Sequence, residues 1–129
     1  MSKTLKKILY VEDDEDIAEI AQMILEEIGG FEVMHCSSGQ KALDAYPNYN
    51  PQLVLMDVMM PKMDGPETLE NLRKMPEEKD TPVIFMTAKA QTHEQVAYRN
   101  MGALGVIVKP FDPETLCDHI NALWERRHR

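Results

Sequence analysis

The sequence lacks the features of disulfide-stapled, metal-clustered and membrane-spanning proteins. Its 129 residues include two cysteines, Cys36 and Cys117, whose separation does not match the CxxC spacing of zinc or redox sites. We therefore expect both cysteines to be small, buried apolar residues. No apolar run is long enough to cross a bilayer, and residues 1–7 lack the apolar segment of a signal peptide. These absences predict a cytoplasmic protein that does not attach to membranes.

Positive charge is scarce, and so are glycine-rich segments. The 14 Lys and Arg residues are outnumbered by 22 Asp and Glu residues, and the resulting formal net charge of −8 disfavours direct binding of nucleic acid. The one basic cluster, residues 126–129, ends the chain, where we expect it to complement the negative end of a terminal helix. The sequence has no glycine-rich loop of the kind that cradles a nucleotide phosphate.

Short apolar segments alternate with helical segments along the whole chain. Hydrophobic residues make up 43% of the sequence, which is enough for the core of one globular domain of this length. Strands are predicted at residues 7–11, 31–36, 53–57, 82–87 and 105–108. Residues 53–56 show no polar alternation, which is typical of a strand buried on both faces. The pattern predicts an α/β fold with a five-stranded parallel sheet covered by helices on both faces.

Capping residues and helix breakers predict where the helices begin and end. Apolar residues repeat with helical spacing from residue 17 to residue 28, and we expect one helix there. The predicted boundary residues are Gly29-Gly30, Pro47 and Gly102 as stops, Ser37-Ser38 and Asp112 as N-caps, Thr92 with Gln95 as a capping box, and Pro66 as a first helical residue.

Polar residues of complementary chemistry stand at the carboxyl ends of four predicted strands: Glu12 and Asp13, then Asp57, Thr87 and Lys109. Parallel strands place these ends at one edge of the sheet, so we expect the side chains to share a shallow cleft. Carboxylates gathered there repel one another unless a cation intervenes, and Mg²⁺ prefers such hard oxygen ligands. The lysine and the threonine would remain free to hold the oxygens of a phosphoryl group.

Each of these residues also has an ordinary structural explanation. Asp57 could bond its own backbone in the turn after its strand, and residues 12–16 could be a solvated acidic loop at the positive end of a helix. Lys109 could extend into solvent, and Thr87 could be a β-branched strand residue. The joint occurrence of all these residue types at strand ends favours a shared site.

As an ordered set, these residues resemble the receiver domain of bacterial two-component response regulators over essentially the full length of the chain. The matching motifs are Glu12-Asp13, Asp57, Met60-Pro61-Lys62-Met63-Asp64-Gly65, Thr87-Ala88 and Lys109-Pro110-Phe111. The resemblance implies a flavodoxin-like (βα)5 three-layer sandwich with strand order 2-1-3-4-5. It also implies that residues 1–129 form one receiver domain, and we expect no output domain in this chain.

The resemblance assigns the phosphoacceptor and the metal ligands. Asp57 would accept a phosphoryl group, so the domain would be a phosphoacceptor and not an enzyme, apart from self-phosphorylation and slow self-dephosphorylation. Asp13 and Asp57 would ligate Mg²⁺ directly, or Mn²⁺ as a substitute. The backbone carbonyl of Met59 would be a third protein ligand, and Glu12 would act largely through water.

The resemblance also assigns the groups that hold the phosphoryl oxygens. Lys109 would pair with Asp57 and later with a phosphoryl oxygen, while the Thr87 hydroxyl and the Ala88 N–H would bond the other two. The peptide bond between Lys109 and Pro110 is expected to be cis.

The implied partners are proteins. A sensor histidine kinase or a histidine phosphotransfer protein would donate the phosphoryl group, and a downstream target would bind the surface of the fourth helix, fifth strand and fifth helix. Here that surface would comprise residues 92–101, 104–108 and 112–124. We expect a monomer or a weak dimer without a direct nucleic-acid contact.

One position departs from the family pattern. Where the family usually has Tyr or Phe, three residues before the lysine, this chain has Val106, which is too short and stiff for the inward swing of an aromatic ring. We therefore expect the signal to pass through displacement of residues 89–92 and the fourth helix.

Two other functions fit part of the pattern. A haloacid-dehalogenase-type, Mg-dependent phosphatase also forms an aspartyl phosphate, but it needs a second Asp two residues after the nucleophile, where this chain has Met59. A pseudo-receiver would serve as an interaction module without phosphorylation, and the complete set of acceptor-site residues argues against it. The four histidines, His35, His93, His119 and His128, have no cluster spacing and are predicted to be surface or helix residues.

Overall fold

Five parallel β-strands form one sheet in the order β2-β1-β3-β4-β5. The structure is a computed structural model and describes residues 4–77 and 80–128. The strands are β1 (Lys7–Val11), β2 (Glu32–Cys36), β3 (Leu53–Asp57), β4 (Val83–Thr87) and β5 (Gly105–Val108). All five predicted strands are present to within one residue, and the flavodoxin-like strand order is confirmed.

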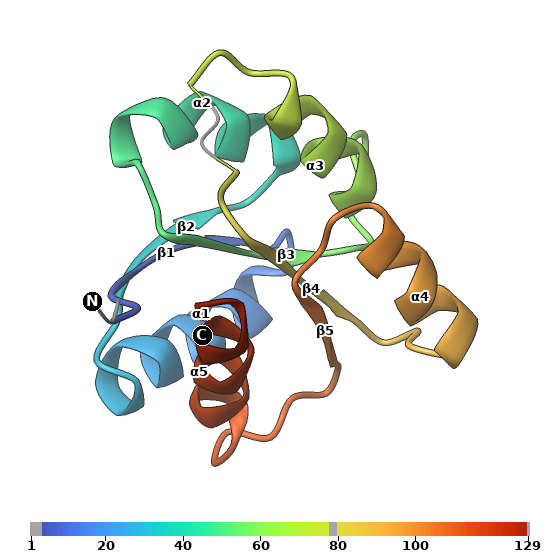
Figure 1. Cartoon of the computed structure of the whole chain (residues 1–129). Coiled ribbons are helices and arrows are strands. Elements are labelled where there is room, and N and C mark those ends of the chain that lie inside the picture. Colours follow the sequence, from blue (N-terminus) through green and yellow to red (C-terminus); the bar gives the residue numbers. More distant parts are fainter. Residues whose placement is uncertain (1–3, 78–79, 129) are drawn as a thin grey trace.

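Helices cover both faces of the sheet and give the predicted three layers (Figure 1). One face carries α1 (Glu15–Met23), its continuation η1 (Ile24–Ile28) and α5 (Leu116–Arg127); the other carries α2 (Gly39–Tyr49), α3 (Gly65–Arg73) and α4 (Thr92–Asn100). Along β1, Ile8 and Tyr10 enter the core beneath α1 and α5, while Leu9 and Val11 enter the opposite core. Burial on both faces explains why the strands are apolar without alternation.

Helix α2 runs through Pro47 to Tyr49, so the prediction that Pro47 ends it is wrong. The helix ends at Asn50, whose φ of 51° is left-handed and whose N–H donates to the carbonyl of Tyr46. A proline lacks its own N–H, and because only two helical residues follow Pro47, the lost bond affects the final turn alone. Ser38 caps the start of this helix as predicted, accepting the N–H of Lys41 at 3.1 Å.

The helix predicted over residues 17–28 changes its winding in its last turn. Residues of η1 form a π-helical turn, after which the Gly29 N–H donates to the carbonyl of Ile24 at 3.2 Å. The wider turn rotates Ile28 out of the apolar face that the spacing predicted, and its side chain is 65% exposed. Gly30 ends the element as predicted, with a left-handed φ of 71°.

Helix α4 is capped one residue earlier than predicted. Gln91 has the extended backbone of an N-cap, whereas Thr92 is already helical. The capping box accordingly uses Glu94 and not Gln95, and the Gln91 N–H donates to Glu94 Oε1 at 3.1 Å. The prediction of a box from Thr92 to Gln95 is therefore wrong by one residue.

Helix α5 begins later than predicted, at Leu116. Asp112 does not cap it directly but closes a separate turn, in which Asp112 Oδ1 accepts the N–H of Glu114 at 2.9 Å. The carbonyl of Asp112 then accepts the N–H of Leu116 at 2.9 Å, so this turn leads into the helix.

The cysteines and the basic cluster largely follow expectation. Cys36 and Cys117 are free and buried, and burial raises the pKa of each thiol. Arg126 and Arg127 lie in the last turn of α5, and Arg127 also pairs with Asp80, with 3.3 Å between Nη2 and Oδ2; residue 129 lies outside the described residues.

None of the described helices combines the length and apolarity that a membrane span requires.

Gly65 begins α3 directly against the end of β3. Its N–H donates to the carbonyl of Val58 at 2.8 Å, and a Cβ at this position would lie 2.6 Å from the carbonyl oxygen of Asp57. Asp64 is the N-cap, so Pro66 is the second helical residue. The prediction that Pro66 is the first helical residue is therefore wrong by one position. The close approach at Gly65 fixes how the chain leaves Asp57.

We expect Gly65→Ala to lower the free energy of unfolding by about 1–3 kcal/mol, because the added methyl group meets rigid backbone. Urea denaturation monitored by circular dichroism measures the loss. Glu70→Ala is the control in the same helix: its side chain is exposed, so the change should stay within about 0.5 kcal/mol. Equal stabilities of the two variants would contradict the close packing described for Gly65.

Candidate functional site

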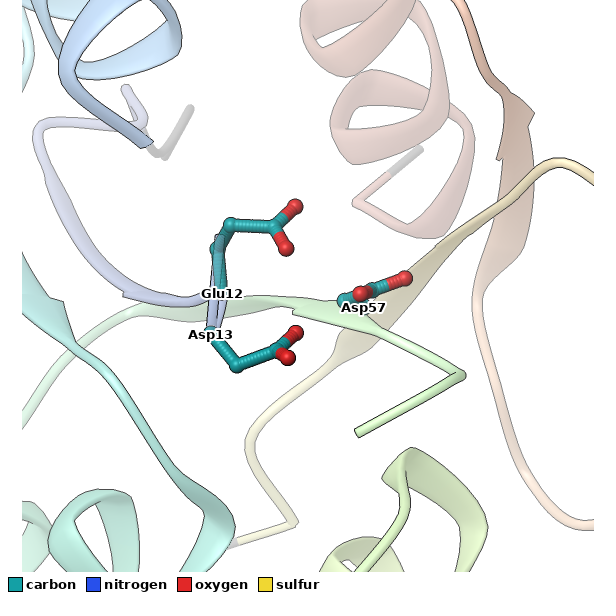
Figure 2. A group of neighbouring side chains, drawn as sticks. All are labelled: Glu12, Asp13 and Asp57. Atoms are coloured by element: carbon teal, nitrogen blue, oxygen red, sulfur yellow. The ribbon is translucent and has the colours of Figure 1, made fainter. Parts of the chain in front are cut away.

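Three carboxylates meet at the carboxyl edge of the sheet. Glu12 and Asp13 directly follow β1, and Asp57 is the last residue of β3. One oxygen from each lies within 4.8 Å of the other two. Figure 2 shows the Glu12 and Asp13 carboxylates extending from the same segment toward the side on which Asp57 lies. The predicted convergence of these residues is present in the structure.

The ammonium group of Lys109 joins two of these carboxylates. Its Nζ lies 2.6 Å from Glu12 Oε1 and 3.2 Å from Asp57 Oδ1. The lysine follows β5, which is separated from β1 by β3 and β4, so its side chain spans the edge of the sheet. Glu12 is 1% exposed and Asp57 5% exposed, and both ion pairs are thereby shielded from water. The pair with Glu12 is shorter than the pair with Asp57 that the resemblance implied.

The cluster carries more negative than positive charge. Glu12, Asp13, Asp57 and Lys109 have a formal charge of −2 when all are ionised, because three carboxylates face one ammonium group. Burial, with the charge of Asp57, raises the pKa of Glu12 to about 6 although Lys109 opposes the shift. Burial by itself lowers the pKa of Lys109, but its bond to Glu12 and the charge of Asp57 outweigh burial and raise that pKa. Burial is thus the main cause of the Glu12 shift, whereas the neighbouring carboxylates cause the Lys109 shift.

This set of donors fits a divalent magnesium ion. Mg²⁺ takes oxygen ligands, usually one or two carboxylates with several waters. Its two positive charges balance the formal charge of −2 on the cluster. Asp13 and Asp57 could hold it directly, whereas both oxygens of Glu12 already accept hydrogen bonds, Oε1 from Lys109 and Oε2 from the Asp14 N–H. The backbone carbonyl of Met59 stays a predicted ligand; the Met59 side chain is 63% exposed.

The remaining predicted residues border the carboxylates. Thr87 ends β4, is buried, and its Oγ1 accepts the N–H of Lys89 at 3.0 Å. Ala88 is exposed at the rim, beside the strand end that carries Asp57. The Lys109–Pro110 peptide bond is cis, the isomer expected from the resemblance. Of these groups, the Lys109 ammonium has a direct contact with the Asp57 carboxylate, and Thr87 and Ala88 lie at the end of the neighbouring strand.

His35 contacts the backbone of the acidic segment, which no sequence pattern predicted. It was predicted to be a surface or helix residue, but it lies half-buried in β2, with Nε2 2.8 Å from the carbonyl oxygen of Glu12. Its ring also contacts that of Tyr10, with 5.8 Å between the centroids. No sequence pattern signals this bond, because its acceptor is a backbone carbonyl that every residue possesses.

Val106 lies outside the carboxylate cluster, in a small apolar group between β5 and α4. It is buried and pairs in register with Phe85 of β4. The Phe85 ring in turn meets the ring of Tyr98 on α4 edge to face, at 5.3 Å between centroids and an interplanar angle of 66°. Tyr98 of α4 thus contacts the register partner of Val106.

Comparison with protein families and curated proteins gives one consistent result. The family model described as "Response regulator receiver domain" matches residues 8–121. The chain is 39% identical over 121 residues to "Probable transcriptional regulator ycf27" of Cyanophora paradoxa, covering 94% of this chain and 49% of that protein. It is 35% identical over 121 residues to "Alkaline phosphatase synthesis transcriptional regulatory protein PhoP" of Bacillus subtilis (strain 168), with the same coverage. The chain spans about half the length of these curated relatives.

Solved structures agree with the family match. The chain resembles chemotaxis protein CheY4 of Vibrio cholerae with a TM-score of 0.84 and 29% identity, covering 93% of this chain and 99% of that one. It also resembles a CheY-like response regulator receiver domain protein of Methanospirillum hungatei JF-1, with a TM-score of 0.80, 33% identity and coverages of 96% and 98%. The chain belongs to the family of response regulator receiver domains.

Proposed function

We propose that this receiver domain accepts a phosphoryl group on Asp57 in the presence of Mg²⁺. The main support is the geometry of the carboxylates: Asp57 shares one ammonium group with buried Glu12, and Asp13 lies beside both. A carboxylate in that setting is held in place, and the charge deficit around it favours a cation. The donor would be a phosphohistidine on a sensor kinase or on a histidine phosphotransfer protein.

In the transfer, an oxygen of Asp57 forms a bond to phosphorus as the bond from phosphorus to the donor imidazole nitrogen breaks. The bound metal would draw charge from the phosphoryl oxygens, and Asp13 with Asp57 would hold it. Lys109 lies 3.2 Å from Asp57 Oδ1 and supplies a second positive charge. Glu12 keeps that ammonium at the edge of the sheet through its 2.6 Å contact.

Thr87 and Ala88 would hold the other phosphoryl oxygens. The Thr87 hydroxyl oxygen already accepts the N–H of Lys89, and its hydrogen is available for donation to a phosphoryl oxygen. A shift of the hydroxyl toward Asp57 would weaken its bond to Lys89, so the loop that leads into α4 would respond to phosphorylation. This is the route by which we connect the site to the outer surface.

Helix α4 is suited to respond, because none of its described residues is fully buried. Its ring contact with the sheet runs from Tyr98 to Phe85, two residues before Thr87 on the same strand. Phosphorylation would then alter the surface formed by α4, β5 and α5, to which a downstream protein binds. Exposed Val96, Met101 and Val108 give that surface apolar character.

The proposed partners are proteins of a cytoplasmic two-component pathway. The relatives named above are called transcriptional regulators, and this chain spans about half of their length. We propose that the domain itself acts through protein contacts as a monomer or a weak dimer, since its net charge of −8 opposes binding to phosphate backbones.

We expect Mg²⁺ to stabilise the protein against unfolding, by about 2.7 kcal/mol at a concentration 100 times its Kd. Asp13→Asn should reduce this gain, because it removes one ligand and one charge. Thermal unfolding with and without MgCl₂, at constant ionic strength, measures the effect. Asp16→Asn removes an exposed carboxylate outside the cluster and serves as the control. A gain in Asp13→Asn equal to that of the wild type would exclude Asp13 as a ligand.

Incubation with acetyl phosphate and Mg²⁺ should add one acid-labile phosphoryl group, detectable by intact-protein mass spectrometry. Asp57→Asn should abolish the addition, since the amide is not a nucleophile of this kind. Asp64→Asn changes a carboxylate in the following loop that caps α3, and labelling should persist. Absence of label in the wild type would support the pseudo-receiver, and rapid continuous turnover of phosphodonor would support the phosphatase.

Beryllofluoride with Mg²⁺, as a phosphoryl mimic, should shift the NMR signals of residues 89–92 and of α4. Thr87→Ala should reduce these shifts, because the hydroxyl that bonds Lys89 is absent. The signals of α2, which packs against α3, β1 and β2, give the internal reference. Shifts confined to the metal ligands, with none in residues 89–100, would contradict the route through α4.

A further inference from the structure

Two residues at the end of β2 bond the backbone of Glu12, one at its N–H and one at its carbonyl. The Glu12 N–H donates to the carbonyl of Cys36 at 3.0 Å, and the Glu12 carbonyl lies 2.8 Å from Nε2 of His35. The first bond is made between backbone groups, so it does not depend on which side chain stands at position 36. The second depends on the side chain at position 35.

The chemistry of the acceptor determines the protonation of His35. A carbonyl oxygen only accepts hydrogen bonds, so Nε2 must carry the proton in this contact. The ring is held in place by Tyr10, its register partner on β1, with 5.8 Å between centroids and 42° between ring planes. Tyr10 is fully buried, and the imidazole is therefore supported on one side by a fixed surface.

This bond acts on Asp13 through the peptide group. The Glu12 carbonyl and the Asp13 N–H belong to one planar unit, so a donor that fixes the carbonyl also fixes the direction in which Asp13 begins. On the other side of Asp13, the Asp14 side chain caps α1 by accepting the N–H groups of Asp16 and Ile17 at 3.0 and 3.1 Å. Asp13 is thus held between two anchored neighbours.

We propose that His35 is a positioning residue for the metal ligand Asp13. Its Nε2–H holds the Glu12–Asp13 peptide in the orientation that brings the Asp13 carboxylate within 4.8 Å of those of Glu12 and Asp57. This inference rests on the proposed function, because the arrangement matters only when a cation joins the carboxylates. Hydrogen-bonding partners behind metal ligands commonly change metal affinity by about 10–100-fold.

Two substitutions separate the hydrogen bond from the packing of the ring. His35→Phe keeps an aromatic ring against Tyr10 but has no N–H, and we expect it to weaken Mg²⁺ binding by about 10-fold or more. His35→Gln loses the ring but retains an N–H donor at similar reach, and it should recover most of the affinity. Mg²⁺ titration of each purified full-length variant, by calorimetry or by NMR shifts, measures the affinities. His119→Phe, an exposed position on α5, is the matched control and should bind as the wild type does.

The outcomes distinguish the two levels of the proposal. A wild type that binds no Mg²⁺ overturns the proposed function and this inference with it. If the wild type binds Mg²⁺ and a folded His35→Phe variant binds it equally well, this inference alone is overturned. The same holds if His35→Gln binds Mg²⁺ more weakly than His35→Phe does. If His35→Phe does not fold, long-range ¹H–¹⁵N correlation spectra of the wild type decide: a His35 ring protonated only on Nδ1 at neutral pH contradicts the bond to Glu12.

Discussion

The ammonium group of Lys109 bonds two carboxylates, Glu12 and Asp57, that are both almost completely buried. Removing one partner of such a buried group costs about 3–5 kcal/mol, because a charge is left without compensation. With Asp13 alongside, the single cation does not balance the three carboxylates. Burial, with the charge of Asp57, raises the pKa of Glu12, and the bond to Glu12 and the charge of Asp57 raise the pKa of Lys109 against the effect of burial. In the proposed function, this unbalanced charge favours a divalent ion at the edge of the sheet, and the ion then favours a phosphoryl group.

The parallel sheet creates this arrangement by placing all strand ends on one side. β1 and β3 are neighbours, so Asp13 and Asp57 meet without a long reach, whereas Lys109 must extend past β4 and β3 from the edge strand. β2 contributes no carboxylate, yet His35 at its end bonds the backbone of the acidic segment. The charged groups of the cluster thus follow or end β1, β3 and β5, while β2 contributes a bond to the backbone of Glu12.

The same geometry connects the site to the outer surface. Thr87 is bonded to the N–H of Lys89, and Phe85 on the same strand contacts Tyr98 of the loosely buried helix α4. Val106 stands where the resemblance implies an aromatic residue, and its register partner Phe85 contacts the Tyr98 ring of α4. In the proposed function, a change at the site reaches α4 through its loop and through this ring contact, without a swing of a β5 side chain.

The sequence alone determined the five strands, their parallel order by resemblance, and the residues at their ends, because apolar runs and strand-end polar residues are local features. It failed where competing local signals had to be resolved: Pro47 within α2, the cap at Gln91, and the late start of α5 at Leu116. Only the tertiary structure decided that Lys109 bonds Glu12 more closely than Asp57, and that His35 faces a carbonyl. Those contacts join residues far apart in the chain, and their distances depend on how strands and side chains pack, which no local pattern encodes.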